Sequence, residues 1–339
     1  MAPRVLICGD LVWAHQECAQ MFEGIGEVIV MDSTDRKSFL ADLKPNGKYS
    51  GIVGCYRHNI SADKIGIFDR EIIQHLSSTG LKWIAHNGAG YDQIDVIACK
   101  DFGIVVSNTP GAVDDATATT ALYLLISTLR QFSWAERSAR SGTWKNPLSS
   151  RNAHDLTGHT LAILGLGGIG LRLAYLVHAF PMRVIYHNRN RVQDAPDWIE
   201  FYEGKDGLDR LLKEADVLSV HVPLRDDTEG MVGEEMIRKL RKGAVIINTA
   251  RGKVIDEEAL IRALEDGHLA AAGLDVYPSE PSINPKLLTF NNVTLLPHMG
   301  TETRDSQKKM EIRALANLRD YLVKGIGSDV VPELRGAKL

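Results

Sequence analysis

The feature that most constrains the fold is a glycine-rich turn between an apolar run and a helix-like segment, in "LAILGLGGIGLRLAYLVHAF". The run Leu161–Gly165 is continuously apolar, as strands buried in a parallel sheet are. Gly165, Gly167 and Gly170 then follow the spacing G-x-G-x-x-G. In a strand–turn–helix unit these glycines permit a tight turn, the approach of a pyrophosphate and close helix packing. A second apolar run, Arg183–His187, completes the unit, so the sequence predicts a dinucleotide site here.

Short apolar runs alternate with helix-like segments along the whole chain, which is typical of α/β folds with parallel sheets. One set of runs lies at 5–9, 27–31, 51–55, 82–88 and 104–107, and a second at 161–165, 183–187, 217–222, 244–248, 272–276 and 293–297. Two sets predict two α/β lobes. The boundary is placed near Pro110 and Gly111, before a long apolar helix that begins near Asp114. The chain is expected to return after Gly300, through a final helix over about Thr301–Val323.

The composition excludes several classes of protein. Of the 339 residues, 44% are hydrophobic and 24% charged, and the net charge is -4. The chain lacks an overall basic footprint and a run of ~18 apolar residues, so neither a nucleic acid nor a membrane is expected as a partner. The start "MAPRVLICGD" becomes polar too early for a secretory signal. Cys8, Cys18, Cys55 and Cys99 lack metal-ligand spacing, which predicts free cysteines, no metal site and a cytoplasmic location.

The second strand of the glycine unit ends in "HNRNR", where the adenosine ribose of a bound dinucleotide is expected. NAD-selective sites usually carry a carboxylate there, about 20 residues past the glycines. This chain has Asn188 instead, and the nearest acid is Asp194. Arg189 and Arg191 could form charge-assisted hydrogen bonds with a 2′-phosphate, so the sequence favours NADP over NAD. Two solvated loop arginines are the alternative interpretation.

Three polar residues follow expected strands of the second set. Arg251 lies in "INTARG", Glu280 in "GLDVYPSEP" and His298 in "LPHMG". Ligands of open α/β sheets bind outside the carboxyl ends of the strands, so we expect the three residues to converge. An arginine can hold a carboxylate and polarise a carbonyl, and a histidine can give a proton to oxygen as a hydride arrives. Each residue alone could be an ordinary surface residue, whereas their shared position indicates a site for 2-oxo acid reduction.

In order along nearly the whole chain, these segments resemble the D-2-hydroxyacid dehydrogenase family. The matching segments are "NGAGYDQID", "NTPGAVDDATA", "GLGGIG", "HVPLRDDTEG", "INTARG", "GLDVYPSEP" and "LPHMG". The resemblance implies two Rossmann-like lobes with parallel sheets and a cleft between them. Residues 1–108 and 302–339 would form a flavodoxin-like substrate (catalytic) domain, and residues 109–301 a dinucleotide-binding domain. It also implies a homodimer.

The resemblance implies roles for individual residues. Arg251 would bind substrate, Glu280 would orient His298 and raise its pKa, and His298 would donate or accept the proton. Backbone amides at Ala89 and Gly90 would hold the substrate carboxylate. The predicted cofactor-binding residues are Thr117, Gly165, Gly167, Gly168, Ile169, Gly170, Asn188, Arg189, Arg191, Val222, Pro223, Thr228, Thr249, Ala250, Asp275 and Gly300. Among these, Thr117 would approach the phosphates, Val222 and Pro223 would line the adenine pocket, and Asp275 would meet the nicotinamide amide.

Two positions fit the family pattern less well or lie outside it. Many relatives carry an acid where Thr119 or Thr120 stands here, so no role is transferred to that helix position. Tyr56 and Arg57 follow a strand of the first set and should face the cleft, which makes them candidate substrate-specificity residues. A solvated loop is the alternative for that segment.

The sequence therefore predicts an NAD(P)-dependent D-2-hydroxyacid dehydrogenase or glyoxylate reductase, with NADP preferred. Its substrate would be glyoxylate, hydroxypyruvate or a bulkier 2-oxo acid, since the chain also resembles fungal mandelate dehydrogenases. Formate dehydrogenases share the fold but pair the histidine with glutamine, so Glu280 argues against them. A dinucleotide-sensing, corepressor-like scaffold without turnover is the remaining alternative. The end of the chain soon after its last expected helix disfavours it.

Overall fold

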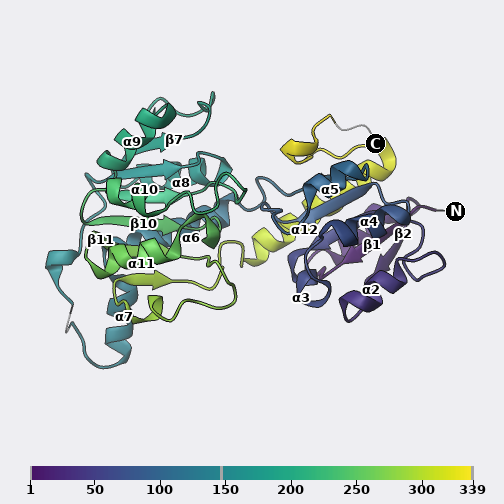
Figure 1. Ribbon diagram of the computed structural model, residues 1–339, viewed down its shortest axis with the longest axis horizontal. Helices are drawn as coiled ribbons and strands as arrows, with labels where there is room; N and C mark the ends of the chain where they lie inside the picture. The colour runs from purple at the N-terminus through teal and green to yellow at the C-terminus, as the bar shows by residue number, and fades with distance from the viewer. Residues whose placement is uncertain (1, 146–147, 337–339) are drawn as a thin grey trace. The chain divides into compact units, whose positions relative to one another are not determined.

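The computed structural model describes residues 2–145 and 148–336. The chain divides into two compact units, Met1–Val113 with Thr303–Leu339, and Asp114–Glu302. Each unit is built on one parallel sheet with helices packed against it (Figure 1). The predicted α/β fold with two lobes is confirmed. The domain limits predicted from the sequence, the roles of the two lobes and the cleft expected between them stay predictions.

The first unit has a five-stranded sheet in the order β2-β1-β3-β4-β5, which is the flavodoxin-like order 2-1-3-4-5. Its strands are β1 (Arg4–Cys8), β2 (Glu27–Val30), β3 (Ile52–His58), β4 (Trp83–Asn87) and β5 (Val105–Ser107). Its helices are α1 (His15–Phe22), α2 (Arg36–Asp42), α3 (Ala62–Ile65), α4 (Arg70–Ser78), α5 (Val96–Asp101) and α12 (Arg304–Lys324), with 3-10 turns η1 (Asn59–Ser61) and η5 (Pro332–Leu334). Asp35, Asp69, Asp95 and Thr303 cap α2, α4, α5 and α12 by accepting a backbone N–H with their side chains.

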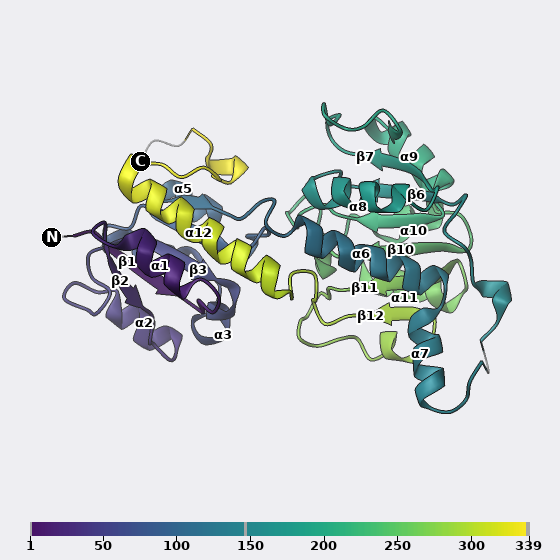
Figure 2. The same ribbon diagram turned by 180° about the vertical axis from the view of Figure 1, so that it is seen from behind.

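The strands of this first sheet other than the edge strand β2 are buried on both faces, which is why they read as unbroken apolar runs. Leu6 and Ile84 pack into the core on one face, and Val5 and Trp83 pack into the core on the other. Helix α12 covers the second face, where the ring of Trp83 stacks on Tyr321 with 5.3 Å between centroids (Figure 2). The last helix of the chain is therefore part of the first unit's core.

The second unit has a seven-stranded sheet in the order β12-β11-β10-β9-β6-β7-β8. Its strands are β6 (Thr160–Leu164), β7 (Arg183–His187), β8 (Ile199–Phe201), β9 (Val217–Val220), β10 (Ala244–Asn248), β11 (Leu269–Leu274) and β12 (Val293–Leu295). Its helices are α6 (Asp114–Leu129), α7 (Phe132–Arg140), α8 (Gly168–His178), α9 (Gly204–Glu214), α10 (Glu234–Lys239) and α11 (Glu257–Glu265), with 3-10 turns η2 (Ser150–Asn152), η3 (Gly252–Val254) and η4 (Leu287–Thr289). Counted from β6, the order is the dinucleotide-binding order 3-2-1-4-5-6 with one more strand, and the order reverses between β6 and β9.

Three local features differ from the sequence-based expectation. The helix expected to run from Asp114 through Phe132 breaks after Leu129, because Gln131 takes a left-handed conformation with φ 56° and α7 starts anew. Strand β8 was not predicted, since a three-residue edge strand leaves little pattern. Strand β11 begins at Leu269 rather than near residue 272, because its alanines are poor strand indicators.

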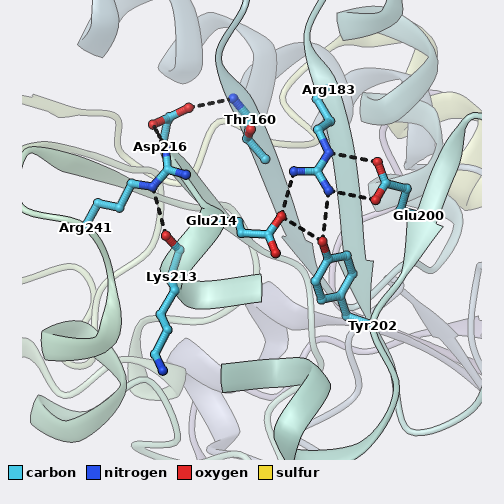
Figure 3. A network of polar contacts seen from close by, with 8 residues as sticks. All are labelled: Thr160, Arg183, Glu200, Tyr202, Lys213, Glu214, Asp216 and Arg241. Atoms are coloured by element: carbon cyan, nitrogen blue, oxygen red, sulfur yellow. Dashed lines mark hydrogen bonds and ion pairs between the residues drawn. The ribbon is translucent and has the colours of Figure 1, made fainter. Parts of the chain in front are cut away.

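Polar side chains hold the amino ends of the second sheet together, as Figure 3 shows. Arg183, the first residue of β7, donates hydrogen bonds to the carboxylates of Glu200 (2.8 and 2.7 Å) and Glu214 (2.6 Å). The backbone N–H of Thr160, the first residue of β6, donates to Asp216 at 2.8 Å. This network lies at the amino ends of the strands. The glycine turn and the loops described next lie at the opposite, carboxyl ends.

Candidate active site

The glycine turn follows β6 at the carboxyl edge of the second sheet. Gly165 has φ 100°, and a Cβ there would lie 2.9 Å from the backbone carbon of His221, so only glycine fits. A Cβ on Gly170 would lie 2.7 Å from the carbonyl oxygen of Gly165, which keeps α8 close to the strand. By contrast, a Cβ on Gly167 would meet nothing within 4 Å. The turn therefore leaves open space at Gly167, whereas at Gly168, the first residue of α8, a Cβ would lie 2.2 Å from the Asp114 carboxylate.

A cavity of about 510 Å³ opens beside this turn, at the carboxyl ends of β6, β7 and β9. Its predicted lining residues are Gly165, Gly167, Asn188, Arg189, Val222, Pro223 and Thr228, and its unpredicted ones are Leu164, Leu166, His187, Asn190, His221, Arg225, Asp227 and Met231. Leu164, Leu166, His187, Asn190 and His221 directly adjoin predicted residues, so position at the end of a strand could have found them, whereas Arg225, Asp227 and Met231 lie farther along the loop after β9. The cavity is of a size and place that fit the adenosine half of a dinucleotide.

Two residues of the "HNRNR" segment contribute to this cavity in different ways. The side-chain oxygen of Asn188 accepts a hydrogen bond from Leu166 N–H at 2.7 Å, so Asn188 fastens the glycine turn to β7. Arg189 lies on the cavity wall and forms an ion pair with Asp227, with 3.7 Å between Nη1 and Oδ2. Arg191 is exposed and is not among the residues that line the cavity. Arg189 is therefore the arginine that the cavity wall contains, and the contact of Arg191 with a nucleotide stays a prediction.

His221 also lines the cavity. Burial lowers its pKa to about 4, so its ring is neutral at physiological pH. Its Nε2 lies 2.8 Å from the hydroxyl of Ser219. This histidine adds a polar but uncharged surface to the cavity.

The second group of residues lies after β10, β11 and β12. The Nδ1 of His298 donates to Oε2 of Glu280 at 2.7 Å, and Oε1 of Glu280 accepts from Tyr277 N–H at 2.9 Å. The hydrogen bond to Glu280 raises the pKa of His298 above its ordinary value, although burial and the charge of Arg251 oppose it. Burial acts to raise the pKa of Glu280, but the hydrogen bonds from His298 and Tyr277 outweigh it and the net shift is downward. The pair therefore favours an imidazolium beside a carboxylate.

Asp275 fixes the backbone of the loop that carries His298. His298 has φ 57°, a left-handed conformation that is uncommon and costly for a residue with a Cβ. Its N–H donates to the carbonyl oxygen of Asp275 at 2.8 Å. The two carboxylate oxygens of Asp275 accept from Met299 N–H (2.6 Å) and Gly300 N–H (2.8 Å). Buried Asp275, predicted to meet a nicotinamide amide, thus has both oxygens engaged by this loop.

Arg251 is brought to the same place by a close approach of two loops. A Cβ on Gly252 would lie only 2.3 Å from Pro278 N, so a glycine here lets the loop after β10 touch the loop after β11. The amide of Asn248 donates to the Arg251 carbonyl at 2.9 Å and holds that loop. The charge of Arg251 lowers the pKa values of both Glu280 and His298. The structure therefore brings the three predicted residues together within one unit.

Other predicted cofactor residues surround this group. The Thr117 hydroxyl donates to the carbonyl oxygen of Gly300 at 3.1 Å, which ties α6 to the His298 loop. Thr249 is buried and Ala250 half-buried, in the loop that leads to Arg251. Their contact with a cofactor stays a prediction.

The two candidate specificity residues of the first unit are not where the sequence placed them. Arg57 is 0% exposed: it donates to Asn59 (2.5 Å) and Gln93 (2.7 Å) and packs over the ring of Phe68. Burial lowers its pKa to about 10. Tyr56 is also 0% exposed. Both residues thus lie inside β3 rather than in a solvated loop after it, and their contact with substrate stays a prediction.

The loop after β4 in the first unit has an orientation that suits anion binding. Its carbonyl oxygens at Gly88, Ala89 and Gly90 accept from Thr109 N–H (3.0 Å), the Asn108 amide (2.8 Å) and the His86 ring (2.8 Å). In a trans peptide the N–H points away from the carbonyl. The amides of Ala89 and Gly90 therefore point away from these donors, and their contact with a substrate carboxylate stays a prediction.

Within residues 2–145 and 148–336, no group of three or more His, Cys, Asp or Glu side chains could hold a metal ion. No helix in this described part of the chain is long and apolar enough to cross a membrane.

Comparisons with known proteins agree with this arrangement. The family model for the D-isomer specific 2-hydroxyacid dehydrogenase NAD binding domain matches residues 122–300. The chain is 40% identical over 331 residues to 4-methyl-2-oxopentanoate reductase A of Aspergillus oryzae, covering 98% of each chain. It is similar to the crystal structure of a glyoxylate reductase from Paecilomyes thermophila (TM-score 0.92, 41% identity, 98% and 99% covered). It is also similar to an NADPH-dependent glyoxylate/hydroxypyruvate reductase of Sinorhizobium meliloti, in complex with NADP and malonate (TM-score 0.82, 29% identity, 100% and 99% covered).

Proposed function

The chain belongs to the D-isomer specific 2-hydroxyacid dehydrogenase family, a family of oxidoreductases, and from this premise we propose that it reduces a 2-oxo acid to the D-2-hydroxy acid with NAD(P)H. The observation that carries the proposal is the hydrogen-bonded pair of His298 and Glu280 with the charge of Arg251 beside it. The names of the relatives, which include a 4-methyl-2-oxopentanoate reductase and a glyoxylate reductase, support 2-oxo acids as the substrate class.

We propose a division of labour among these three residues. The nicotinamide, when bound, supplies a hydride to the carbonyl carbon of the substrate. His298 uses its Nδ1 to hold Glu280, which leaves Nε2 to give a proton to the carbonyl oxygen. Glu280 stabilises the protonated ring. Arg251 provides a fixed positive charge that orients the substrate and stabilises the charge that develops on oxygen.

For the cofactor, we propose NADP as the preferred form and NAD as second choice. Arg189 on the cavity wall supports this preference, because a 2′-phosphate offers it a charge-assisted hydrogen bond. Asn188, in place of the usual carboxylate, brings no negative charge to the end of β7. Gly167 and the start of α8 would accommodate the pyrophosphate.

The family resemblance also leads us to propose a homodimer that acts in the cytoplasm. Light scattering of the purified protein and fractionation of cells would check these two proposals.

A turnover assay tests the main proposal. The purified protein is given NADPH or NADH and a series of 2-oxo acids that runs from glyoxylate and hydroxypyruvate through 4-methyl-2-oxopentanoate to phenylglyoxylate. We expect oxidation of NADPH with at least one member, and a product of D configuration. Lack of turnover across the series with both cofactors would refute the proposed function.

A further inference from the structure

One carboxylate lies on the wall of the nucleotide cavity, although the position directly after β7 is Asn188 rather than an acid. Asp227 comes from the loop after β9, and β9 lies on the far side of β6 from β7. Its Oδ2 is 3.7 Å from Nη1 of Arg189, on the cavity wall. Among the described residues that line this cavity, Asp227 is the one acid, beside the cations Arg189 and Arg225. The loop after β9 therefore supplies the negative charge that is missing at the end of β7.

The loop that carries Asp227 is held by its own hydrogen bonds. The Thr228 hydroxyl donates to the Pro223 carbonyl at 2.6 Å and accepts from Arg225 N–H at 2.8 Å. The N–H groups of Thr228 and Glu229 both donate to the Arg225 carbonyl at 2.9 Å. The backbone position of Asp227 therefore does not depend on its ion pair with Arg189, and its charge stays near the cavity when that pair opens.

The ion pair itself is easily broken. The side chains of Arg189 and Asp227 are 76% and 61% exposed, so water and salt screen their attraction. A 2′-phosphate carries up to two negative charges and offers Arg189 stronger, shorter hydrogen bonds than this carboxylate does. When Arg189 turns toward the phosphate it leaves Asp227, and an unpaired carboxylate remains near the new anion.

We propose that Asp227 competes with the 2′-phosphate of the cofactor for Arg189, and so limits how strongly the protein prefers NADP over NAD. The proposal rests on the proposed cofactor function of this cavity and adds a residue that sets its selectivity. Loss of the Asp227 charge frees Arg189 and removes a repulsion, and both effects favour the 2′-phosphorylated nucleotide. A nucleotide without that phosphate gains neither.

The test measures nucleotide binding directly and needs no turnover. Isothermal titration calorimetry at low ionic strength compares adenosine 2′,5′-bisphosphate with 5′-AMP on wild-type protein and Asp227→Asn. We expect the Kd for the bisphosphate to fall roughly threefold to fivefold in the variant, and the Kd for 5′-AMP to change by less than about twofold. Asp226→Asn is the matched control, since it removes the same charge from the neighbouring residue, which is not among the lining residues. It should leave both Kd values within about twofold.

A double-mutant cycle tests the competition itself. In an Arg189→Ala background, Asp227→Asn should lose most of its effect on the bisphosphate. The same gain with and without Arg189 would overturn the competition. So would weaker 5′-AMP binding to Asp227→Asn, which would identify Asp227 as an acceptor for the ribose hydroxyls. No effect of Asp227→Asn, or no binding of either nucleotide to wild-type protein, would also overturn the proposal. Failure to reduce any 2-oxo acid would refute the proposed function and leave these binding results intact.

Discussion

The Nδ1 of His298 lies 2.7 Å from Oε2 of Glu280, and the backbone of His298 is held in a left-handed conformation by Asp275. Glu280 has the larger effect on the protonation of the ring, to which the charge of Asp275 adds little, and Asp275 sets the position of the ring. The two effects can be separated by mutation.

Replacement of Glu280 by Gln tests the effect on protonation. The carboxylate raises the pKa of His298, and reduction needs the protonated ring, so the rate of reduction should fall as pH rises through that raised value. Without the charge, the pKa moves back toward the ordinary ~6.5 and the falling limb moves to lower pH. The rising limb of the oxidation reaction should move down with it. The measurement is kcat against pH in both directions, with chemistry shown to limit the rate. Unmoved profiles would rule out the coupled pair.

Replacement of His298 by Ala should remove the proton donor and leave the nucleotide cavity intact, because that cavity is lined by other residues. We expect kcat to fall by ~10²–10⁴-fold, which is the usual contribution of a general acid. The Kd of NADPH should change little. Steady-state kinetics measure the fall in kcat, and a fluorescence titration measures the Kd of NADPH. Near-normal turnover would exclude His298 as the donor.

Replacement of Asp275 by Asn tests the effect on position. An amide can accept from only one of the N–H groups of Met299 and Gly300, and its NH₂ then faces the other donor. Loss of a hydrogen bond to a charged group costs about 1.5–3 kcal/mol, part of which should appear as a lower melting temperature. We expect kcat to fall while the pH of the falling limb stays within about half a unit. Thr117→Val is the control, because it removes a different bond to Gly300 and keeps both bonds to Asp275.

Replacement of Arg189 by Ala tests the choice of cofactor. One lost charge-assisted contact costs about 1.5–3 kcal/mol, which corresponds to roughly tenfold to hundredfold weaker NADPH binding. NADH binding should stay nearly constant. Arg191→Ala is measured beside it, and a smaller effect is expected, since Arg191 is exposed and is not among the residues that line the cavity. Equal losses for NADPH and NADH, or a wild type that prefers NADH, would contradict the assignment.

Replacement of Asp216 by Ala tests whether the amino edge of the second sheet is structural. The change removes the acceptor of Thr160 N–H and of Arg241, which is expected to cost about 1–3 kcal/mol of the free energy of unfolding. Denaturant unfolding would measure the cost. The KM values for both substrates should stay unchanged, because these groups lie at the edge opposite the glycine turn.

The sequence contained enough information for the fold and for the three residues around His298. Continuous apolar runs reveal buried strands, and residues just past such runs must meet at one sheet edge. Asp227 could not be found in this way, because its nearness to Arg189 depends on the placement of β9 and β7 on either side of β6. The burial of Arg57 could not be predicted from the sequence either, because its partners Asn59 and Gln93 come from two separate segments, after β3 and after β4.

The left-handed conformation of His298 was also beyond the sequence. A proline precedes it, which restricts the preceding backbone but does not reveal a positive φ. Its cause is the set of hydrogen bonds to Asp275, which lies in a different loop. The helix break at Gln131 could not be predicted from the sequence either, because no glycine or proline marks it.

Arg251, Glu280 and His298 all belong to the uninterrupted segment Asp114–Glu302, whereas the first unit is made from the two ends of the chain. The residues proposed for proton transfer therefore come from one continuous stretch of the sequence. Chimaeras could be made in which the two segments of the first unit come from a relative and Asp114–Glu302 is kept unchanged. Such chimaeras would test whether substrate preference comes from the first unit.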